Sequence, residues 1–422
     1  MPYYKNSRSN KSGQKNRNNN NDRHNFSRRP NNNGRPSGNK RFGNGGKKHQ
    51  GAYIHPSKFI NRATTTTETA PYEPQNNFSD FPFTAKLAAN IAAQKYQTPS
   101  AIQDQSIPHI LAGKDLIGLA NTGTGKTAAF LLPLINKLDT TKKPLSALIL
   151  APTRELAGQI EDQFRMFSND MNLYATLLVG GSNIDRQIAK LKRNPHVIIA
   201  TPGRMMDLVK RKQLSLQNID TLVLDEADRM LDMGFISDIR AVVKLTPASR
   251  QTLFFSATMT TKVKQITEEF LTNPEIISVK TTDTSDRVDQ NIVEINQGED
   301  KLAKLLNILS DQEFEKVLLF GRTKHGVQRL SDNLRKQDIS SVAIHGNKSQ
   351  SQRQKALSIF KDGKARVMVA TDVAARGLDI PNVTHVINFD QPATYEDYIR
   401  RIGRTGRGSA TGIALTFVEK RQ

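Results

Sequence analysis

Residues 120–127 read Ala120-Asn121-Thr122-Gly123-Thr124-Gly125-Lys126-Thr127, and they lie between a short apolar run and an amphipathic one. Glycines in a strand-to-helix turn let backbone N–H groups point inward around phosphate oxygens. The Lys126 ammonium suits the β- and γ-phosphates, and the Thr127 hydroxyl suits Mg²⁺. Ala120 replaces the first glycine of the general pattern. A chance glycine turn is the alternative, but the strand-loop-helix setting favours a nucleotide-phosphate loop made by the whole stretch.

Short apolar runs alternate with helix-like stretches on both sides of this loop, as in βα units. They are bounded by Gly, Pro or charge, which is typical of strands buried on both faces of a parallel sheet. We expect strands at 115–120, 147–151, 176–180, 197–200, 221–224 and 252–255, and again at 317–320, 342–344, 367–370, 386–389 and 413–417. The polar stretch 280–289 predicts a linker. The fold class is therefore α/β, with two tandem parallel-sheet domains and a cleft between them.

The chain has 422 residues, no cysteine, and 61 Lys+Arg against 40 Asp+Glu, a net charge of +21. This charge favours a polyanionic partner such as nucleic acid. Without cysteine, a metal has only oxygen or imidazole ligands, which makes phosphate-bound Mg²⁺ the natural candidate. No apolar run is long enough to span a bilayer, and the first residues lack the apolar core of a signal peptide. We expect a soluble, cytoplasmic protein without membrane partners.

The first sixty residues hold fourteen of the basic residues against one acid, Asp22, so they carry +13 of the net charge. Their Asn-, Gly- and Ser-rich composition predicts a disordered arm at 1–77. Aromatic residues are interleaved with the cations and suit stacking on single-stranded bases: Tyr3, Tyr4, Phe26, Phe42 and Tyr53. The arm is therefore expected to add nucleic-acid affinity, and a merely solubilising tail is the alternative.

Residues 225–228 read Asp225-Glu226-Ala227-Asp228 and follow the expected strand at 221–224. Buried acids at a strand end need a cation. Asp225 would hold Mg²⁺, directly or through water, while Glu226 orients and deprotonates an attacking water. An acidic strand-end loop is the alternative, and the upstream phosphate loop makes it the weaker one.

These four residues spell the motif of the DEAD-box ATP-dependent RNA helicases, and the chain resembles that family from about Phe78 to Phe417. Further family motifs occur in the family's order: 152–157 (PTRELA), 180–181 (GG), 201–204 (TPGR), 256–258 (SAT), 370–372 (ATD), 376–379 (RGLD) and 401–407 (RIGRTGR). Residues 322–326 and 345–350 look most like the bacterial RhlE-like subgroup. The resemblance implies two RecA-like domains, which we place at 78–282 and 290–422 with a linker at 283–289.

The resemblance also assigns the ATP site. Residues 96–103 resemble the family's Q motif, in which the Gln103 amide reads adenine, Tyr96 packs on the ring, and Phe78 is the upstream aromatic. Gly377 and Asp379 would approach the ribose. Arg404 and Arg407, in the second domain, would reach the γ-phosphate as arginine fingers when the cleft closes.

For coupling, the resemblance implies that Ser256 and Thr258 link hydrolysis to strand separation. Arg400 stands where most members have histidine, so it either pairs with Asp228 or weakens the coupling. The implied RNA contacts are to sugar and phosphate, with little base preference: Arg154, Gly181, Thr201, Gly203, Arg204, Arg322, Thr323, Gly346, Gln350, Arg353 and Thr371.

The function that we expect is ATP-dependent RNA unwinding or remodelling by a monomeric core. We expect no RNA-binding module beyond the strand at 413–417, so the arm would supply any accessory binding. Two alternatives stay open: a DNA helicase or translocase of the same superfamily, and an RNA chaperone in which the arm dominates and the ATPase is weak.

Overall fold

The structure is a computed structural model, and it describes residues 54–62, 72–121, 123–279, 287–375, 378, 380–406 and 411–420. Several predictions lie outside these residues. They are the disorder of residues 1–53 together with their five aromatic residues, and the site roles of Thr122, Gly377, Asp379 and Arg407. Among the described helices, none is both long and apolar enough to cross a membrane.

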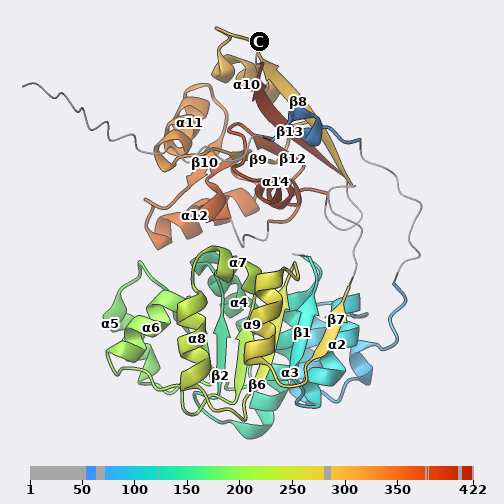
Figure 1. Cartoon of the computed structure of the whole chain (residues 1–422), viewed down its shortest axis with the longest axis vertical. Coiled ribbons are helices and arrows are strands. Elements are labelled where there is room, and N and C mark those ends of the chain that lie inside the picture. Colours follow the sequence, from blue (N-terminus) through green and yellow to red (C-terminus); the bar gives the residue numbers. More distant parts are fainter. Residues whose placement is uncertain are drawn as a thin grey trace, which may run out of the picture. The chain divides into compact units, whose positions relative to one another are not determined.

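The first lobe is built on a seven-stranded parallel sheet (Figure 1). Its strand order is β3-β4-β2-β5-β6-β1-β7. The strands are β1 (Leu116–Leu119), β2 (Ala147–Leu150), β3 (Ala175–Leu178), β4 (Val197–Ala200), β5 (Thr221–Leu224), β6 (Gln251–Ser256) and β7 (Glu275–Ser278). All four residues of each of the strands β2, β4 and β5 are buried, as their apolar runs predict.

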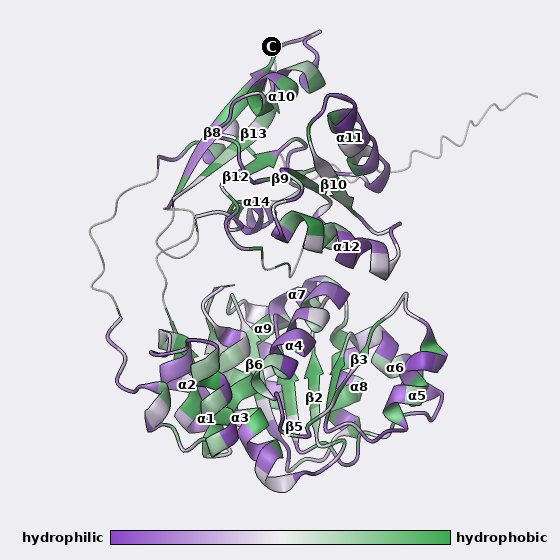
Figure 2. Cartoon of the chain, turned by 180° about the vertical axis from the view of Figure 1, so that it is seen from behind, coloured by the Kyte–Doolittle hydropathy of each residue, from purple (hydrophilic) through white to green (hydrophobic). Residues whose placement is uncertain are grey.

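Helices cover both faces of this sheet. The helices are α1 (Ala85–Ala93), α2 (Ala101–Leu111), α3 (Lys126–Thr141), α4 (Arg154–Phe167), α5 (Ile184–Leu191), α6 (Pro202–Lys210), α7 (Ala227–Asp232), α8 (Ile236–Leu245) and α9 (Thr261–Phe270). Alternate residues of β2 enter two separate cores, Ile149 with α1 to α4 and Leu148 with α6 to α9. Figure 2 shows the hydrophobic strands between helices with hydrophilic outer surfaces.

The second lobe has a six-stranded parallel sheet in the order β10-β11-β9-β12-β13-β8. Its strands are β8 (Val288–Ile295), β9 (Val317–Phe320), β10 (Ser341–Ile344), β11 (Val367–Ala370), β12 (His385–Asn388) and β13 (Gly412–Glu419). Its helices are α10 (Lys301–Leu309), α11 (Lys324–Lys336), α12 (Gln350–Lys361), α13 (Asp372–Ala375) and α14 (Tyr395–Ile402). Two cores again lie on opposite faces, one with α10 and α11 and the other with α12 to α14. The predicted pair of RecA-like α/β domains is confirmed.

Every predicted strand is present, with ends displaced by at most two residues. Two edge strands were not predicted. β7 is only half-buried, and β8 alternates buried and exposed residues, so neither has the continuous apolar run of a central strand. Because β8 begins at Val288, the last two residues of the predicted linker 283–289 belong to this strand, and the domain boundaries stay predictions.

The arm predicted at 1–77 is not disordered throughout, because residues 54–62 and 72–77 have defined structure. The short helix η1 (Pro56–Phe59) places the Phe59 ring in the second lobe's core, fully buried and 4.7 Å from the Tyr398 ring centroid. Asn61 then exchanges two backbone hydrogen bonds with Gln290. The composition of residues 1–77 taken as a whole did not predict these contacts, because one buried aromatic side chain is enough to anchor a short segment.

Candidate functional site

The phosphate loop connects β1 to α3. Gly125 has φ of +96°, and a Cβ added there would lie 2.4 Å from the Gln103 Nε2 atom, so only glycine fits. Lys126 begins α3 and is 6% exposed, and its Nζ donates a 2.6 Å hydrogen bond to the Ala120 carbonyl. The ammonium therefore lies across the loop, near the N-terminus of a helix whose free N–H groups favour an anion. Thr127 is the next residue of α3.

The first turn of α2 is fastened to this loop. Ser100 caps α2, and its hydroxyl donates to the Thr124 carbonyl at 2.7 Å. The Gln103 amide donates to the Gly125 carbonyl at 3.1 Å and accepts the Ser100 N–H at 2.9 Å. A primary amide has a second N–H and a second lone pair, so these bonds still permit contact with a base. Gln103 therefore shapes the phosphate loop, a role that the sequence did not reveal.

The buried Phe78 and Phe81 form an aromatic cluster with the partly buried Tyr96. The Phe78 ring lies edge-on to Tyr96 at 5.7 Å and to Phe81 at 6.1 Å between centroids. Tyr96 in turn packs edge-on against Phe167 of α4 at 5.5 Å. Of the three residues expected at the adenine, Phe78 and Tyr96 contact each other and Gln103 contacts the phosphate loop, while their contact with adenine stays a prediction.

Asp225 and Glu226 follow β5 and are 2% and 4% exposed. Burial raises the pKa of Asp225, the nearby Glu226 carboxylate raises it further, and Lys126 opposes both. A buried carboxylate in this position is stabilised by a cation, and carboxylate and hydroxyl oxygens are the ligands that Mg²⁺ prefers. The donor set of Asp225 and Thr127 therefore fits Mg²⁺ bound to phosphate.

Glu226 is paired with a residue that we did not predict. The Arg229 Nη1 atom donates to Glu226 Oε2 at 2.7 Å, and both side chains are less than a tenth exposed. Glu226 also has φ of +50° and ψ of +49°, a left-handed conformation that costs about 1–3 kcal/mol in a non-glycine residue. The i,i+3 spacing of these opposite charges at the start of α7 was the available sequence signal.

The expected coupling residues of the first lobe contact one another. The Thr258 hydroxyl donates to Asp228 Oδ2 at 3.3 Å, and the Ser256 hydroxyl donates to the Thr258 carbonyl at 2.8 Å. The Ser256 carbonyl accepts the Ala120 N–H at 3.1 Å. A chain of hydrogen bonds and backbone therefore joins Asp228 to the start of the phosphate loop.

The expected RNA-binding residues of the first lobe lie after the carboxyl ends of β2, β3 and β4. The Arg154 guanidinium lies against Gly181, where a Cβ would come within 2.0 Å of Nη1. Gly181 has φ of +74°, a second reason for glycine. Thr201 is the N-cap of α6, and a Cβ on Gly203 would meet no atom within 4 Å. The first turn of α6 is thus accessible to a phosphate.

Arg204 donates from both Nη atoms to the Ser182 carbonyl, at 3.2 and 3.3 Å. In the second lobe, Thr323 and Ser349 cap α11 and α12, and Gln350 is the first residue of α12. Arg353 is 8% exposed, and its Nη2 lies 2.9 Å from Glu155 Oε2. The other expected contacts, Arg322, Gly346 and Thr371, follow strands β9, β10 and β11. RNA contact by each of these residues stays a prediction.

Arg400 forms ion pairs with Asp397 at 2.7 Å and with Asp232 at 3.5 Å. Burial alone would lower the pKa of Arg400, but Asp397, Asp232 and the more distant Asp228 raise it. Asp228 therefore acts on Arg400 through its charge, whereas the residue of α7 that forms an ion pair with Arg400 is Asp232. A role of Arg400 in coupling RNA binding to hydrolysis stays a prediction.

Arg401, for which we predicted no role, donates hydrogen bonds from three of its nitrogen atoms. It binds both oxygens of Asp372 at 2.6 and 2.7 Å, and it donates to Asn388 Oδ1 and the Asp390 carbonyl. Arg404 is 4% exposed and donates to the Leu378 carbonyl at 2.5 Å. The family's arginine segment thus contributes one arginine that binds Asp372 and one that binds the Leu378 carbonyl.

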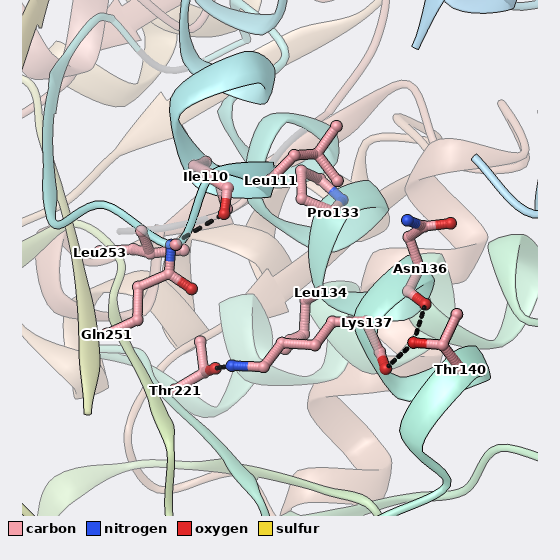
Figure 3. A pocket seen from close by; sticks show the side chains of 11 residues that line it. Ile110, Leu111, Pro133, Leu134, Asn136, Lys137, Thr140, Thr221, Gln251 and Leu253 are labelled. Carbon is pink, nitrogen blue, oxygen red and sulfur yellow. Dashed lines mark hydrogen bonds between the residues drawn. The ribbon is translucent and has the colours of Figure 1, made fainter. Parts of the chain in front are cut away.

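The first lobe also contains a cavity of about 340 Å³ between α2, α3, β5 and β6 (Figure 3). Lys137 lies across it and donates to the Thr221 hydroxyl at 2.9 Å. Thr221 and Gln251 are the first residues of their strands. The cavity is therefore at the amino ends of the strands, away from the phosphate loop, and it is not the nucleotide site.

Two family models match the chain: the DEAD/DEAH box helicase model at residues 100–266 and the helicase conserved C-terminal domain model at 300–409. The chain is 46% identical over 348 residues to the ATP-dependent RNA helicase CshA of Listeria monocytogenes, covering 82% of this chain and 66% of that protein. The DEAD-box helicase CshA of Bacillus licheniformis is 45% identical, with 82% and 71% covered.

Two solved structures of other proteins share the fold of this chain. Dbp5 of S. cerevisiae bound to RNA and ADP BeF3 has a TM-score of 0.72 and 30% identity, covering 82% of this chain and 90% of that chain. Mss116p bound to ssRNA and AMP-PNP has a TM-score of 0.73 and 29% identity, with 83% and 76% covered.

These curated relatives are named CshA, so the predicted RhlE-like subgroup is not confirmed. The chain spans about two thirds of the length of the curated relatives that it matches. The family itself rests on both domain models, on this identity and on the shared fold. The chain belongs to the DEAD-box ATP-dependent RNA helicases.

Proposed function

We propose that this chain is an RNA-stimulated ATPase that unwinds short RNA duplexes or remodels RNA–protein complexes. The main support is one arrangement in the first lobe. Lys126 begins α3 after β1, the buried pair Asp225 and Glu226 follows β5, and the Gln103 amide of α2 donates to the Gly125 carbonyl of the phosphate loop. These groups at the carboxyl end of one parallel sheet support recognition of phosphate, metal and base.

In the hydrolysis step, Lys126 neutralises the β- and γ-phosphates and the N-terminus of α3 binds their oxygens. Thr127 and Asp225 would hold Mg²⁺, which supplies charge neutralisation on the transferring phosphoryl group when bound. Glu226 accepts a proton from the attacking water. The hydrogen bond from Arg229 to Glu226 Oε2 holds this carboxylate in a fixed orientation.

We assign the second lobe the transition-state cations, Arg404 and Arg407. A guanidinium delivered to the γ-phosphate stabilises charge only in the arrangement that places it there, which makes hydrolysis conditional on the second lobe. Gly377 and Asp379 would contact the ribose. Phe78 and Tyr96 would pack beside adenine, whose edge Gln103 reads.

RNA would lie along the carboxyl ends of the strands in both lobes. In the first lobe its phosphates would meet the first turn of α6 and the arginines Arg154 and Arg204, and in the second lobe the starts of α11 and α12. Backbone amides and arginines contact sugar and phosphate without reading bases, so little sequence preference is expected. The solved structures of Dbp5 and Mss116p contain bound RNA, which supports RNA as the polymer.

The deciding experiment measures ATPase rate and strand separation on matched RNA and DNA duplexes with a short single-stranded overhang. The proposal expects ATP hydrolysis stimulated by RNA, unwinding of RNA that requires ATP, and neither activity in Lys126→Ala. Equal stimulation by DNA would favour the translocase alternative. Strand exchange that needs no ATP and survives Lys126→Ala would favour the arm-driven chaperone.

We also propose that residues 1–53 add RNA affinity through their charge, with the core monomeric and cytoplasmic and with Mg²⁺ as the metal. Deleting this arm should make the slope of log affinity against log salt shallower, because each phosphate contact releases counterions. An unchanged slope would assign the arm a solubilising role instead.

A further inference from the structure

The buried Asp104 carboxylate of α2 accepts three hydrogen bonds from one short segment, residues 72–77. The Tyr72 hydroxyl donates to Oδ2 at 2.6 Å, the Gln75 N–H donates to Oδ2 at 2.7 Å, and the Asn76 amide donates to Oδ1 at 2.7 Å. Burial would raise the pKa of Asp104, but these donors outweigh it and the pKa is lowered. An ionised acceptor makes such bonds about twice as strong as neutral ones, so the segment is held firmly.

Asp104 directly follows Gln103, and consecutive helix residues point about 100° apart. The Gln103 amide is directed to the Gly125 carbonyl of the phosphate loop, while the Asp104 carboxylate is directed to residues 72–77. One turn of α2 therefore ties together the phosphate loop and the segment 72–77.

This segment leads without interruption into Phe78. The Asn77 N–H donates to Asp80 Oδ2 at 2.7 Å, which closes the short helix η2 (Phe78–Asp80). The N–H of Phe78 itself makes a bond of 3.5 Å to the Gln97 carbonyl, which is long for a strong hydrogen bond. The backbone position of Phe78 thus depends largely on its neighbours, and on the N-terminal side these are the residues that Asp104 holds.

We propose that Asp104 is a positioning residue for the adenine end of the ATP site, acting by fixing residues 72–77 and through them Phe78. The proposal rests on the proposed function, in which Phe78 lies beside the base. Without the Asp104 charge, and with one of its two oxygens replaced by an N–H group, the segment loses the bonds to that oxygen, and the backbone that leads into Phe78 is held less firmly. Contacts of the base should weaken, while those of the phosphates should persist.

The test uses the full chain with Asp104→Asn, which keeps the shape but removes the charge and directs an N–H group toward the donors of 72–77. At saturating RNA, the KM for ATP should rise about tenfold while kcat stays within about twofold, the pattern of lost ground-state binding. Inorganic tripolyphosphate, which has no base, should inhibit the variant and the wild type with inhibition constants within about twofold.

Asp115→Asn is the matched control. Asp115 also accepts two backbone N–H bonds, from Thr252 at 2.7 Å and from Thr272 at 2.8 Å, but it precedes β1 at the amino end of the sheet. Its loss should lower the melting temperature as Asp104→Asn does and leave the KM for ATP unchanged. Tyr72→Phe should raise the KM for ATP less than Asp104→Asn does. The double variant should raise it no more than Asp104→Asn alone, because both substitutions affect the same bond between Tyr72 and Asp104.

An unchanged KM in folded Asp104→Asn, or an equal rise in the inhibition constant of tripolyphosphate, would overturn the positioning role. If Asp104→Asn does not fold, Tyr72→Phe and Asn76→Ala carry the test, and an unchanged KM in both has the same meaning. A wild-type chain that fails to hydrolyse ATP would instead overturn the proposed function itself, so the two failures are distinguishable.

Discussion

The two lobes share a strand order but bury different sets of charged side chains. Counted from the same edge, the first six strands of the first sheet lie in the order β3-β4-β2-β5-β6-β1. The second sheet has the matching order β10-β11-β9-β12-β13-β8. β1 leads into the phosphate loop and β5 into two buried acids, whereas β8 leads into an ordinary loop and β12 ends in buried Asn388. One fold therefore holds two different sets of side chains, and function follows the side chains.

The buried cations of the second lobe are arginines: Arg353, Arg401 and Arg404, at 8%, 3% and 4% exposed. The first lobe buries the acids Asp225 and Glu226 at 2% and 4%, together with the cations Lys126 and Arg229, each 6% exposed. A buried charge is costly unless it is paired, and a phosphoryl-transfer site needs both metal-binding acids and transition-state cations. This division suggests that neither lobe alone has a complete set of catalytic groups.

The strongest test of this division is Arg404→Ala, which removes a cation of the second lobe and leaves the phosphate loop intact. We expect kcat for ATP to fall about 10³-fold or more, since an arginine finger contributes about 10³–10⁵. ATPase assays check this result, with ATP binding measured in parallel. Arg404→Lys should not restore the rate, because an ammonium lacks the two-pronged geometry of a guanidinium.

Glu226→Gln tests the acidic side of the comparison. The amide cannot accept the proton of the attacking water, so we expect kcat to fall about 10²–10⁴-fold while RNA and ATP remain bound together. Single-turnover hydrolysis and RNA retention measure the two effects. A variant that hydrolyses ATP at the wild-type rate would remove Glu226 from the reaction.

Arg401→Gln separates a structural arginine from a catalytic one. Removing one partner of a buried ion pair typically costs about 3–5 kcal/mol, and Asp372 would lose both of its bonds. Urea unfolding should show this loss in the second lobe. A stability within about 0.5 kcal/mol of wild type would mean that Arg401 has another role.

Asp104→Asn should lower the free energy of unfolding by about 1.5–3 kcal/mol near neutral pH, the range for hydrogen bonds to charged groups. The folded pKa of Asp104 lies below its ordinary value of 3.8. Its contribution is therefore fully present above that value and is lost as pH falls through the folded pKa. Unfolding curves of wild type and variant should converge in acid, and a constant difference would contradict the assignment.

The sequence predicted the parts of this protein that have short-range signals. Central strands such as β2 and β9 are continuous apolar runs, and the phosphate loop carries its own glycines. The edge strands β7 and β8 were missed because partly exposed strands lack such runs. The Phe59 anchor was missed because its partner Tyr398 lies far along the chain.

The same limit applies to the site. The residues of the family motifs lie where strands end, as the motifs indicate. The contacts of Asp104 with residues 72–77 and of Arg401 with Asp372 join positions about 30 residues apart, without any local pattern. Only the fold brings these residues together.

We propose that ATP binding and RNA binding both need the two lobes, and thermodynamic linkage makes this dependence measurable. The dissociation constant of a short single-stranded RNA should be determined with and without a non-hydrolysable ATP analogue. We expect the analogue to tighten RNA binding by about tenfold or more, with the same factor for the analogue when RNA is present. Equal RNA affinity with and without the analogue would contradict the account.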